Sequence, residues 1–199
     1  DTVYIKISDC NRQDGWGGTI KSLTISYLRY EDEPPVELEK PNEGGADTSA
    51  FEPTGVDYAA KYPDRKKVTV TVNASSKQDA PFIVTDTSAA VATQKYTDLA
   101  NEIVYRFDLS KYKDAVVVAT VAQNYFIQVS KDGKTWTTIQ DYAAVHGGRM
   151  EGDGNATTVG VSAEKYAEGA DYLYIRFANA DVKTGWGTAL RQLEIYYVE

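Results

Sequence analysis

The stretch from Ile103 to Ile139, IVYRFDLSKYKDAVVVATVAQNYFIQVSKDGKTWTTI, decides the fold class. Its first residues alternate, with apolar Ile103, Tyr105 and Phe107 on one face of an extended chain and charged residues on the other. This period of two predicts a half-buried β-strand. The run of alanine, valine and threonine at 115–122 is apolar throughout and predicts a central strand that is buried on both faces.

The end of the same stretch predicts a β-hairpin. Two alternating runs flank the dipeptide Asp132-Gly133, which suits a turn with positive φ. Further alternating runs lie at 67–74, 171–178 and 189–199, and only 50–64 and 162–170 carry weak helical signals. Seven or eight short strands without alternating helices predict an all-β fold, an antiparallel β-sandwich of the jelly-roll type.

One phrase occurs near both ends of the chain. DGWGGTIKSLTISY runs from Asp14 to Tyr27 and TGWGTALRQLEIYY from Thr184 to Tyr197, so residues 1–27 align with 171–197 without a gap. A repeat at this separation has the period of a domain. Residues 1–30 are therefore either the closing hairpin of a preceding related module or a pseudo-equivalent hairpin within one sandwich. The Pro- and Glu-rich segment 31–49 reads as a linker, and 50–199 as the β-sandwich module.

Composition narrows the possible partners. The 199 residues carry a formal charge of −8, which argues against nucleic acid as the main partner because its phosphates require a basic face. No apolar run approaches the ~18 residues of a membrane span, so no membrane insertion is expected. The single cysteine, Cys10, excludes an internal disulfide. Fifteen tyrosines and three tryptophans supply flat apolar faces of the kind that meet sugar rings or partner proteins.

Three elements of the sequence resemble the discoidin-like, galactose-binding-like jelly roll. They are the strand end FDLS at 107–110, the hairpin VSKDGKTW at 129–136, and the YIRF at 174–177 that precedes Gly-Trp-Gly. That family includes many carbohydrate-binding modules. The resemblance implies an extracellular or cell-surface location, in a bacterial multimodular protein that degrades glycans. The set of Arg, Asn, His and aromatic residues that such modules carry at one end of the sandwich has no unique match in this chain.

The tryptophans lie at turns and loops where an indole can serve binding or packing. Trp16 and Trp186 lie between glycines in loops that join two strands, where an indole either stacks on a pyranose or plugs the end of its own sandwich. Trp136 follows the Asp132-Gly133 turn and is expected to pin that hairpin onto the sheet.

The Gly-rich segment AVHGGRMEGDGNATT, 144–158, is the best candidate for ligand contacts outside the tryptophan loops. Irregular loops at the end of a sandwich commonly carry binding residues. His146, Arg149 and Asn155 supply hydrogen-bonding groups suited to sugar hydroxyls. The alternative is a solvated loop without a ligand.

Acidic residues before the strand at 103 suggest a metal site. Asp86 and Asp98 lie in this region, and Glu194 on the last strand is a third candidate for one structural Ca²⁺. The resemblance implies such a calcium, but no EF-hand-like spacing supports it. Ordinary surface acids are the competing interpretation.

These features together predict a noncatalytic carbohydrate-binding module. Its expected partners are a glycan or polysaccharide and the neighbouring modules of its own polypeptide. No phosphate-binding loop, H-E-x-x-H or G-x-S-x-G motif appears, so an ancillary module is favoured over an enzyme. A structural or adhesive spacer that binds nothing small is the alternative function.

Overall fold

The computed structural model describes residues 48–98, 100–150, 154–180 and 187–199. All of these residues belong to one structural unit, which begins at residue 42 and runs to the C-terminus. The predicted N-terminal segment 1–30 and most of the predicted linker lie outside the described residues. The described residues therefore correspond to the predicted sandwich module and the last two positions of the linker.

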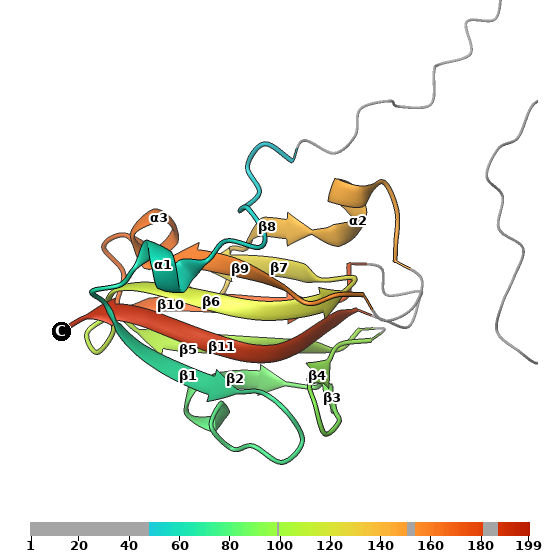
Figure 1. Cartoon of the computed structure of the whole chain (residues 1–199), viewed down its shortest axis with the longest axis horizontal. Helices are drawn as coiled ribbons and strands as arrows, with labels where there is room; N and C mark the ends of the chain where they lie inside the picture. The colour runs from blue at the N-terminus through green and yellow to red at the C-terminus, as the bar shows by residue number, and fades with distance from the viewer. Residues whose placement is uncertain (1–47, 99, 151–153, 181–186) are drawn as a thin grey trace, which may run out of the picture. The chain divides into compact units, whose positions relative to one another are not determined.

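Two antiparallel sheets form the module, as the sequence predicted (Figure 1). The six-stranded sheet has the order β3-β4-β11-β6-β9, and β1 also pairs with β11. Its strands are β1 (Lys66–Thr71), β3 (Ala89–Ala90), β4 (Lys95–Tyr96), β6 (Lys113–Gln123), β9 (Thr157–Ser162) and β11 (Thr188–Val198).

The five-stranded sheet has the order β2-β5-β10-β7-β8. Its strands are β2 (Ile83–Asp86), β5 (Glu102–Asp108), β10 (Tyr172–Ala178), β7 (Phe126–Ser130) and β8 (Thr137–Asp141). Four short helical segments join or flank the strands, namely α1 (Tyr58–Lys61), η1 (Ala80–Phe82), α2 (Tyr142–His146) and α3 (Ala163–Ala167). The acidic region before β5 contains the short strands β2, β3 and β4, none of which the sequence analysis predicted.

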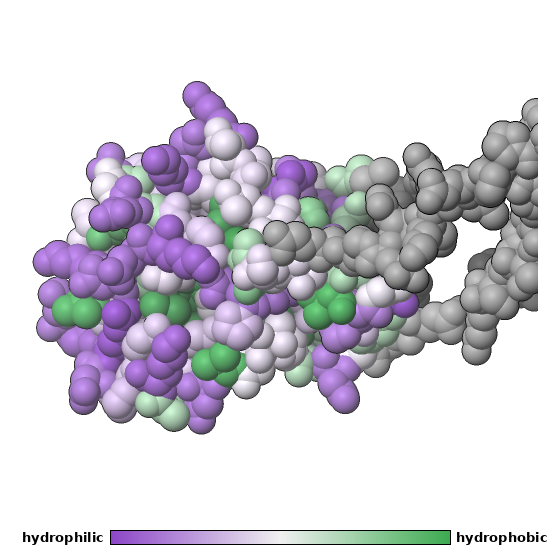
Figure 2. All heavy atoms as spheres, turned by 90° about the horizontal axis from the view of Figure 1, so that it is seen from above, coloured by the Kyte–Doolittle hydropathy of each residue, from purple (hydrophilic) through white to green (hydrophobic). Residues whose placement is uncertain are grey.

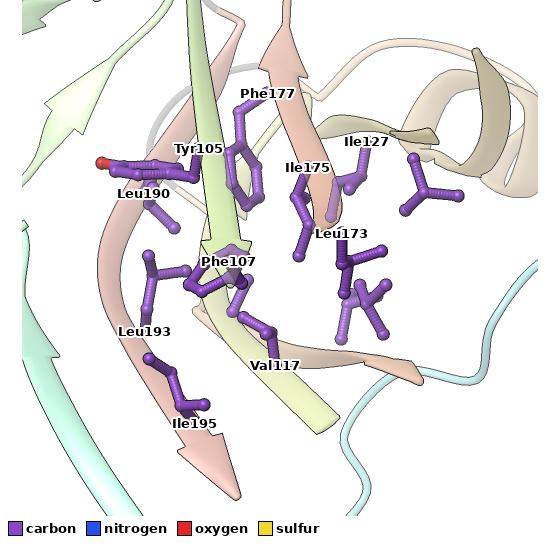
Figure 3. Close-up of a cluster of buried hydrophobic side chains, with 14 of the residues drawn as sticks. Tyr105, Phe107, Val117, Ile127, Leu173, Ile175, Phe177, Leu190, Leu193 and Ile195 are labelled. Atoms are coloured by element: carbon purple, nitrogen blue, oxygen red, sulfur yellow. The ribbon is translucent and has the colours of Figure 1, made fainter. Parts of the chain in front are cut away.

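Alternating side chains from both sheets fill the space between the layers (Figure 3). Tyr105 and Phe107 from β5 and Leu193 and Ile195 from β11 are fully buried there. Their spacing of two residues is the one expected of strands with one face on a core. This confirms the predicted inward face of 103–107.

The strand β6 is buried on both faces, as its continuous apolar sequence predicted. Val117 points into the main core, whereas Val116 and Val118 belong to a second cluster with Tyr58 and Tyr196. Tyr58 comes from α1, so this short helix covers the outer face of the six-stranded sheet at β6. The five-stranded sheet therefore offers the more open outer face to look for a site.

The last two strands do not form a hairpin, which corrects the sequence-based expectation for 171–197. β10 pairs with β5 and β7 in the five-stranded sheet, and β11 pairs with β1, β4 and β6 in the other. The chain therefore crosses from one sheet to the other between them. Alternation predicted two strands correctly, but it does not reveal which neighbour each strand chooses.

The hairpin between β7 and β8 has the predicted turn. Gly133 adopts φ +69°, and the Asp132 carboxylate accepts hydrogen bonds from the backbone N–H groups of Lys134 and Thr135, both at 2.8 Å. These bonds hold the pKa of Asp132 well below its usual range because they favour the ionised form. The turn therefore fixes the position of Trp136, which follows it at once.

We expect Gly133→Ala to destabilise the module by about 1–2 kcal/mol from the positive φ alone. A Cβ there would also lie 3.2 Å from the Tyr174 ring. Gly169→Ala is the matched control, because Gly169 has φ +71° and open space around its missing Cβ. Urea denaturation should rank Gly133→Ala as the more destabilising of the two; equal losses would mean that the contact with Tyr174 carries no cost.

Candidate functional site

The predicted end-loop residues His146, Arg149 and Asn155 are close together in the sequence, but each has different surroundings in the structure. His146 ends α2, is exposed, and lies with its ring centroid 4.2 Å from that of Tyr142. Arg149 donates a hydrogen bond to the Asn179 side chain, and Asn155 is exposed just before β9. Trp16 and Trp186 lie outside the described residues, so both interpretations, sugar stacking and packing at the end of the sandwich, stay open.

Buried polar side chains tie the loops together at this end of the sandwich. Asn124 accepts a hydrogen bond from the Met150 N–H at 2.7 Å and donates one to the Met150 carbonyl at 3.4 Å. The Thr188 hydroxyl donates to the Ala178 carbonyl at 2.8 Å and accepts from the Phe126 N–H at 2.9 Å. Sequence reasoning missed Asn124, Asn179 and Thr188, because nothing in their local pattern marks them as buried. They act as loop anchors.

The three predicted metal ligands are not gathered into one site. Asp86 binds Lys95, Asp98 accepts a hydrogen bond from the Asn101 side chain at 2.7 Å, and Glu194 pairs with Lys67 at 3.1 Å. Within the part of the chain that the structure describes, no three His, Cys, Asp or Glu side chains lie close enough to hold a metal ion. The calcium therefore stays a prediction that no described cluster supports.

An ammonium group instead connects the carboxylates beside β2 and β4. The Nζ atom of Lys95 lies 2.6 Å from Oδ2 of Asp79 and 2.8 Å from Oδ2 of Asp86. The Tyr105 hydroxyl donates a third hydrogen bond to Oδ2 of Asp79 at 3.0 Å. Because Lys95 comes from the six-stranded sheet and Asp86 and Tyr105 from the five-stranded sheet, this network ties the two layers together.

Ionisation in the network follows from these contacts. Burial raises the pKa of Asp86, but the hydrogen bonds from Lys95 and Ser88 outweigh it and leave the pKa below its usual value. Burial likewise lowers the pKa of Lys95, yet its bonds to Asp79 and Asp86 more than compensate and raise it. Lys95 is thus a stable cation with a structural role.

A different part of the molecule, the outer face of the five-stranded sheet, carries a groove with aromatic and hydrogen-bonding residues. On β10 the inward residues Leu173, Ile175 and Phe177 are fully buried, so the alternate residues Tyr172, Tyr174 and Arg176 face outward. A cavity of about 300 Å³ lies over this face. It is lined by Val84, Thr85, Glu102, Val104, Gly133, Trp136, Tyr174 and Arg176.

Arg176 contacts both the hydrogen-bonding side chains and the aromatic side chain of Trp136 in this groove. Its Nε donates to Glu102 at 2.6 Å and its Nη1 donates to Gln128 at 3.1 Å. Its guanidinium carbon lies 5.9 Å from the centre of the Trp136 ring, within the range of a cation–π contact. Trp136 is partly exposed, so the residue that was expected to pin the hairpin packs on the outer face of the sheet and lines the groove.

The outer face of β10 carries further aromatic residues toward the other end of the strand. The rings of Tyr172 and Tyr174 lie 6.3 Å apart between centroids, and strand register places Arg106 opposite Tyr174. A second cavity of about 230 Å³ adjoins this pair and is lined by Pro81, Phe82, Arg106, Asp108, Lys111, Tyr112 and Tyr172. We call the two cavities together the sheet-face groove.

Apolar residues elsewhere on the surface are scattered. Figure 2 shows single hydrophobic residues surrounded by hydrophilic ones on the face it presents. Among the described residues the large hydrophobic side chains that remain exposed are Val84, Val91, Val145 and Val198, and only Val84 lines the groove. Scattered single residues of this kind need no functional explanation.

The fold and this surface define a class: an antiparallel β-sandwich with a shallow aromatic groove on one sheet. Neither a scan against models of known protein families nor a search of curated proteins finds a match to the chain. No helix within the described ranges is long and apolar enough to cross a membrane. The chemistry of the groove is therefore the main guide to function.

Proposed function

We propose that this chain is a noncatalytic carbohydrate-binding module, acting outside the cell or at its surface, and that its sheet-face groove binds the sugar. One observation carries the proposal: Trp136 and Tyr174 line the same cavity as the ion pair of Arg176 and Glu102, and Gln128 accepts a further hydrogen bond from Arg176. Aromatic faces pack against the apolar C–H face of a pyranose, and the neighbouring charged and amide groups can exchange hydrogen bonds with its hydroxyls.

The shape of the groove favours weak, reversible binding of an exposed ligand. Both cavities are small and open at the surface, and strand residues such as Arg106, Tyr174 and Arg176 line them together with residues of η1 and of turns. Such a surface buries only part of a sugar, so we expect a Kd of roughly 0.1–1 mM, or about −4 to −5.5 kcal/mol. Neighbouring modules of the same polypeptide would then add avidity.

Binding without catalysis is favoured by the acids of the groove. Glycoside hydrolysis normally requires two carboxyl groups about 5–10 Å apart across the scissile bond. The cavity beside Trp136 is lined by one described carboxylate, Glu102, and its Oε2 is already paired with Arg176. A structural spacer remains the alternative function, and the end loops with His146, Arg149, Asn155 and Trp186 remain the alternative sugar site.

The test is a glycan array followed by calorimetry with Trp136→Ala. We expect the affinity for a bound glycan to fall at least tenfold, because the stacking surface is removed, while Trp136→Phe retains part of it. Thermal unfolding of each variant checks that the hairpin survives the change.

Trp186→Ala and Arg149→Ala are the contrasting variants. If they abolish binding while Trp136→Ala leaves it unchanged, the sugar site lies at the end loops and not in the groove. If the wild-type module binds no glycan at millimolar concentration, the spacer is preferred.

A further inference from the structure

We propose that the sheet-face groove binds an extended acidic polysaccharide, with the cavity beside Tyr172 receiving the carboxylate of a uronic acid unit. This inference rests on the proposed function and specifies the class of sugar. It depends on the length of the groove, on the charges at its Tyr172 end, and on the geometry of Arg106.

The groove is long enough for more than one sugar ring. Tyr172, Tyr174 and Arg176 are successive outward residues of β10, and four strand residues span roughly 13 Å. Tyr174 lines one cavity and Tyr172 the other, and their ring centroids are 6.3 Å apart. The two cavities therefore lie next to neighbouring side chains of one strand, within reach of successive units of a single chain of sugars.

The two ends of the groove differ in charge. At the Trp136 end the cation Arg176 is neutralised by Glu102 at 2.6 Å. At the Tyr172 end, within the described ranges, neither Arg106 nor Lys111 has a carboxylate within ion-pair distance.

Asp108 is the one acid that lines the cavity at this end. Its carboxylate accepts hydrogen bonds from the Ser110 N–H at 2.9 Å and the Ser110 hydroxyl at 2.7 Å, which form a local turn. The cavity is therefore lined by two cationic side chains, Arg106 and Lys111, and by one carboxylate. A bound anion would therefore meet a net positive pocket.

Arg106 is positioned to receive a planar anion. Its guanidinium carbon lies 4.7 Å from the centre of the Tyr172 ring, so the ring supports the side chain. A guanidinium can form two parallel hydrogen bonds to a carboxylate, and this pairing is stronger than a bond to a neutral hydroxyl. Lys111, whose Nζ lies 5.0 Å from the centre of the Tyr112 ring, adds a second positive charge at the same cavity.

The experiment compares acidic oligosaccharides with their own neutral forms. Calorimetry is run with uronic acid oligosaccharides of two to six units (galacturonate, mannuronate and glucuronate series) and with the same chains after reduction of each carboxyl group to an alcohol. We expect the wild-type module to bind one acidic series about tenfold more tightly than its reduced form, with a preference that weakens from 50 to 500 mM salt.

Arg106→Gln should remove most of this preference, because it should weaken the binding of the acidic chain much more than that of the reduced chain. Arg65→Gln is the matched control, because the Arg65 guanidinium carbon also lies over a tyrosine, 4.6 Å from the centre of the Tyr62 ring, beside the cluster on the other sheet. Arg65→Gln should keep the preference.

Equal binding of acidic and reduced chains, or an equal loss of both on Arg106→Gln, would overturn the acidic specificity and leave carbohydrate binding intact. Trp136→Ala separates the two proposals, since it should weaken both ligands together. If neither ligand of any series binds, the acidic specificity fails, and the glycan array decides separately whether the module binds carbohydrate.

Discussion

Lys95→Met should lower the free energy of unfolding by about 3–5 kcal/mol, the usual cost of leaving a buried charge without its partner. The side chain of Asp79 is only 3% exposed and that of Lys95 10%, and the two lie 2.6 Å apart. Without the ammonium, Asp79 would keep only the hydroxyl of Tyr105 as a described side-chain donor. Urea denaturation measures the change.

The double variant Lys95→Met, Asp79→Asn is the control for this interpretation. It removes the orphaned charge together with its partner, so it should recover part of the stability. A loss below about 1 kcal/mol in the single variant, the scale of an exposed ion pair, would show that water reaches Asp79 and that the network does not hold the sheets together.

The same network predicts the pH dependence of stability. The pKa of Asp86 is lowered in the folded module, so its contribution is present above the ordinary carboxyl pKa of about 3.9 and is lost as pH falls through the folded value. The pKa of Lys95 is raised, so its contribution is present at neutral pH and is lost only as pH rises through a value above 10.5. The wild-type module should therefore lose stability in acid.

Lys95→Met should reverse part of this trend. The hydrogen bond from Lys95 that lowers the pKa of Asp86 would be absent, so the gap in stability between variant and wild type should narrow as pH falls from about 7 toward 3. Urea denaturation at several pH values measures the gap. A constant gap would contradict the assignment of the acid sensitivity to this network.

Gly187→Ala is the second large effect, and we expect a loss of about 2–3 kcal/mol, in the range of overpacked buried sites. A Cβ at this position would lie 2.4 Å from the carbonyl oxygen of Thr97 and 2.9 Å from the Cβ of Asn179. The Gly187 N–H also donates to that carbonyl at 2.7 Å, so the two backbones cannot separate without losing a buried bond. Thermal unfolding measures the loss.

Gly154→Ala is the matched comparison. A Cβ there would also come too close to a neighbour, but the neighbour is the flexible end of the Met150 side chain, which can move aside. We expect Gly154→Ala to cost less than half as much as Gly187→Ala. Similar losses of stability in the two variants would mean that the backbone at Thr97 moves as readily as the Met150 side chain.

The crowding at Gly187 bears on the repeated Gly-Trp-Gly phrase. The second glycine of the C-terminal copy is buried against Thr97 and Asn179, so it is needed for packing at the start of β11. The sequence repeats this glycine at Gly17, which lies outside the described residues. The role of Trp186 beside Gly187 is a separate question, which the binding of glycans by Trp186→Ala answers.

Local pattern predicted the strands well and their partners poorly. Alternation identified β5, β10 and β11 and the inward residues of β5, and the Asp132-Gly133 dipeptide identified the hairpin between β7 and β8. The supposed hairpin between β10 and β11 was wrong, since a strand of either sheet has the same period of two. The short strands β3 and β4, of two residues each, are too brief to produce any period.

The candidate site shows the same difference between what local sequence predicts and what strand pairing decides. Trp136 was singled out from the sequence, but only as a residue that packs the hairpin. Its proximity to Arg176 depends on β7, β8 and β10 lying side by side, a pairing between residues far apart in the chain. The three acids predicted as metal ligands could not be told apart from the sequence. In the structure Asp86, Asp98 and Glu194 each have a different partner and form no common site.

The sequence by itself determined that this protein is a β-sandwich, because alternation and turn residues are properties of neighbouring positions that survive any choice of strand order. Only the tertiary structure brought together the residues of the proposed sugar site. The sheet-face groove joins Glu102 and Arg106 of β5, Arg176 of β10 and Trp136 of the turn before β8, and the pairing of these elements follows from how both sheets bury their apolar faces at once. That is a global packing choice, and no short stretch of the chain contains it.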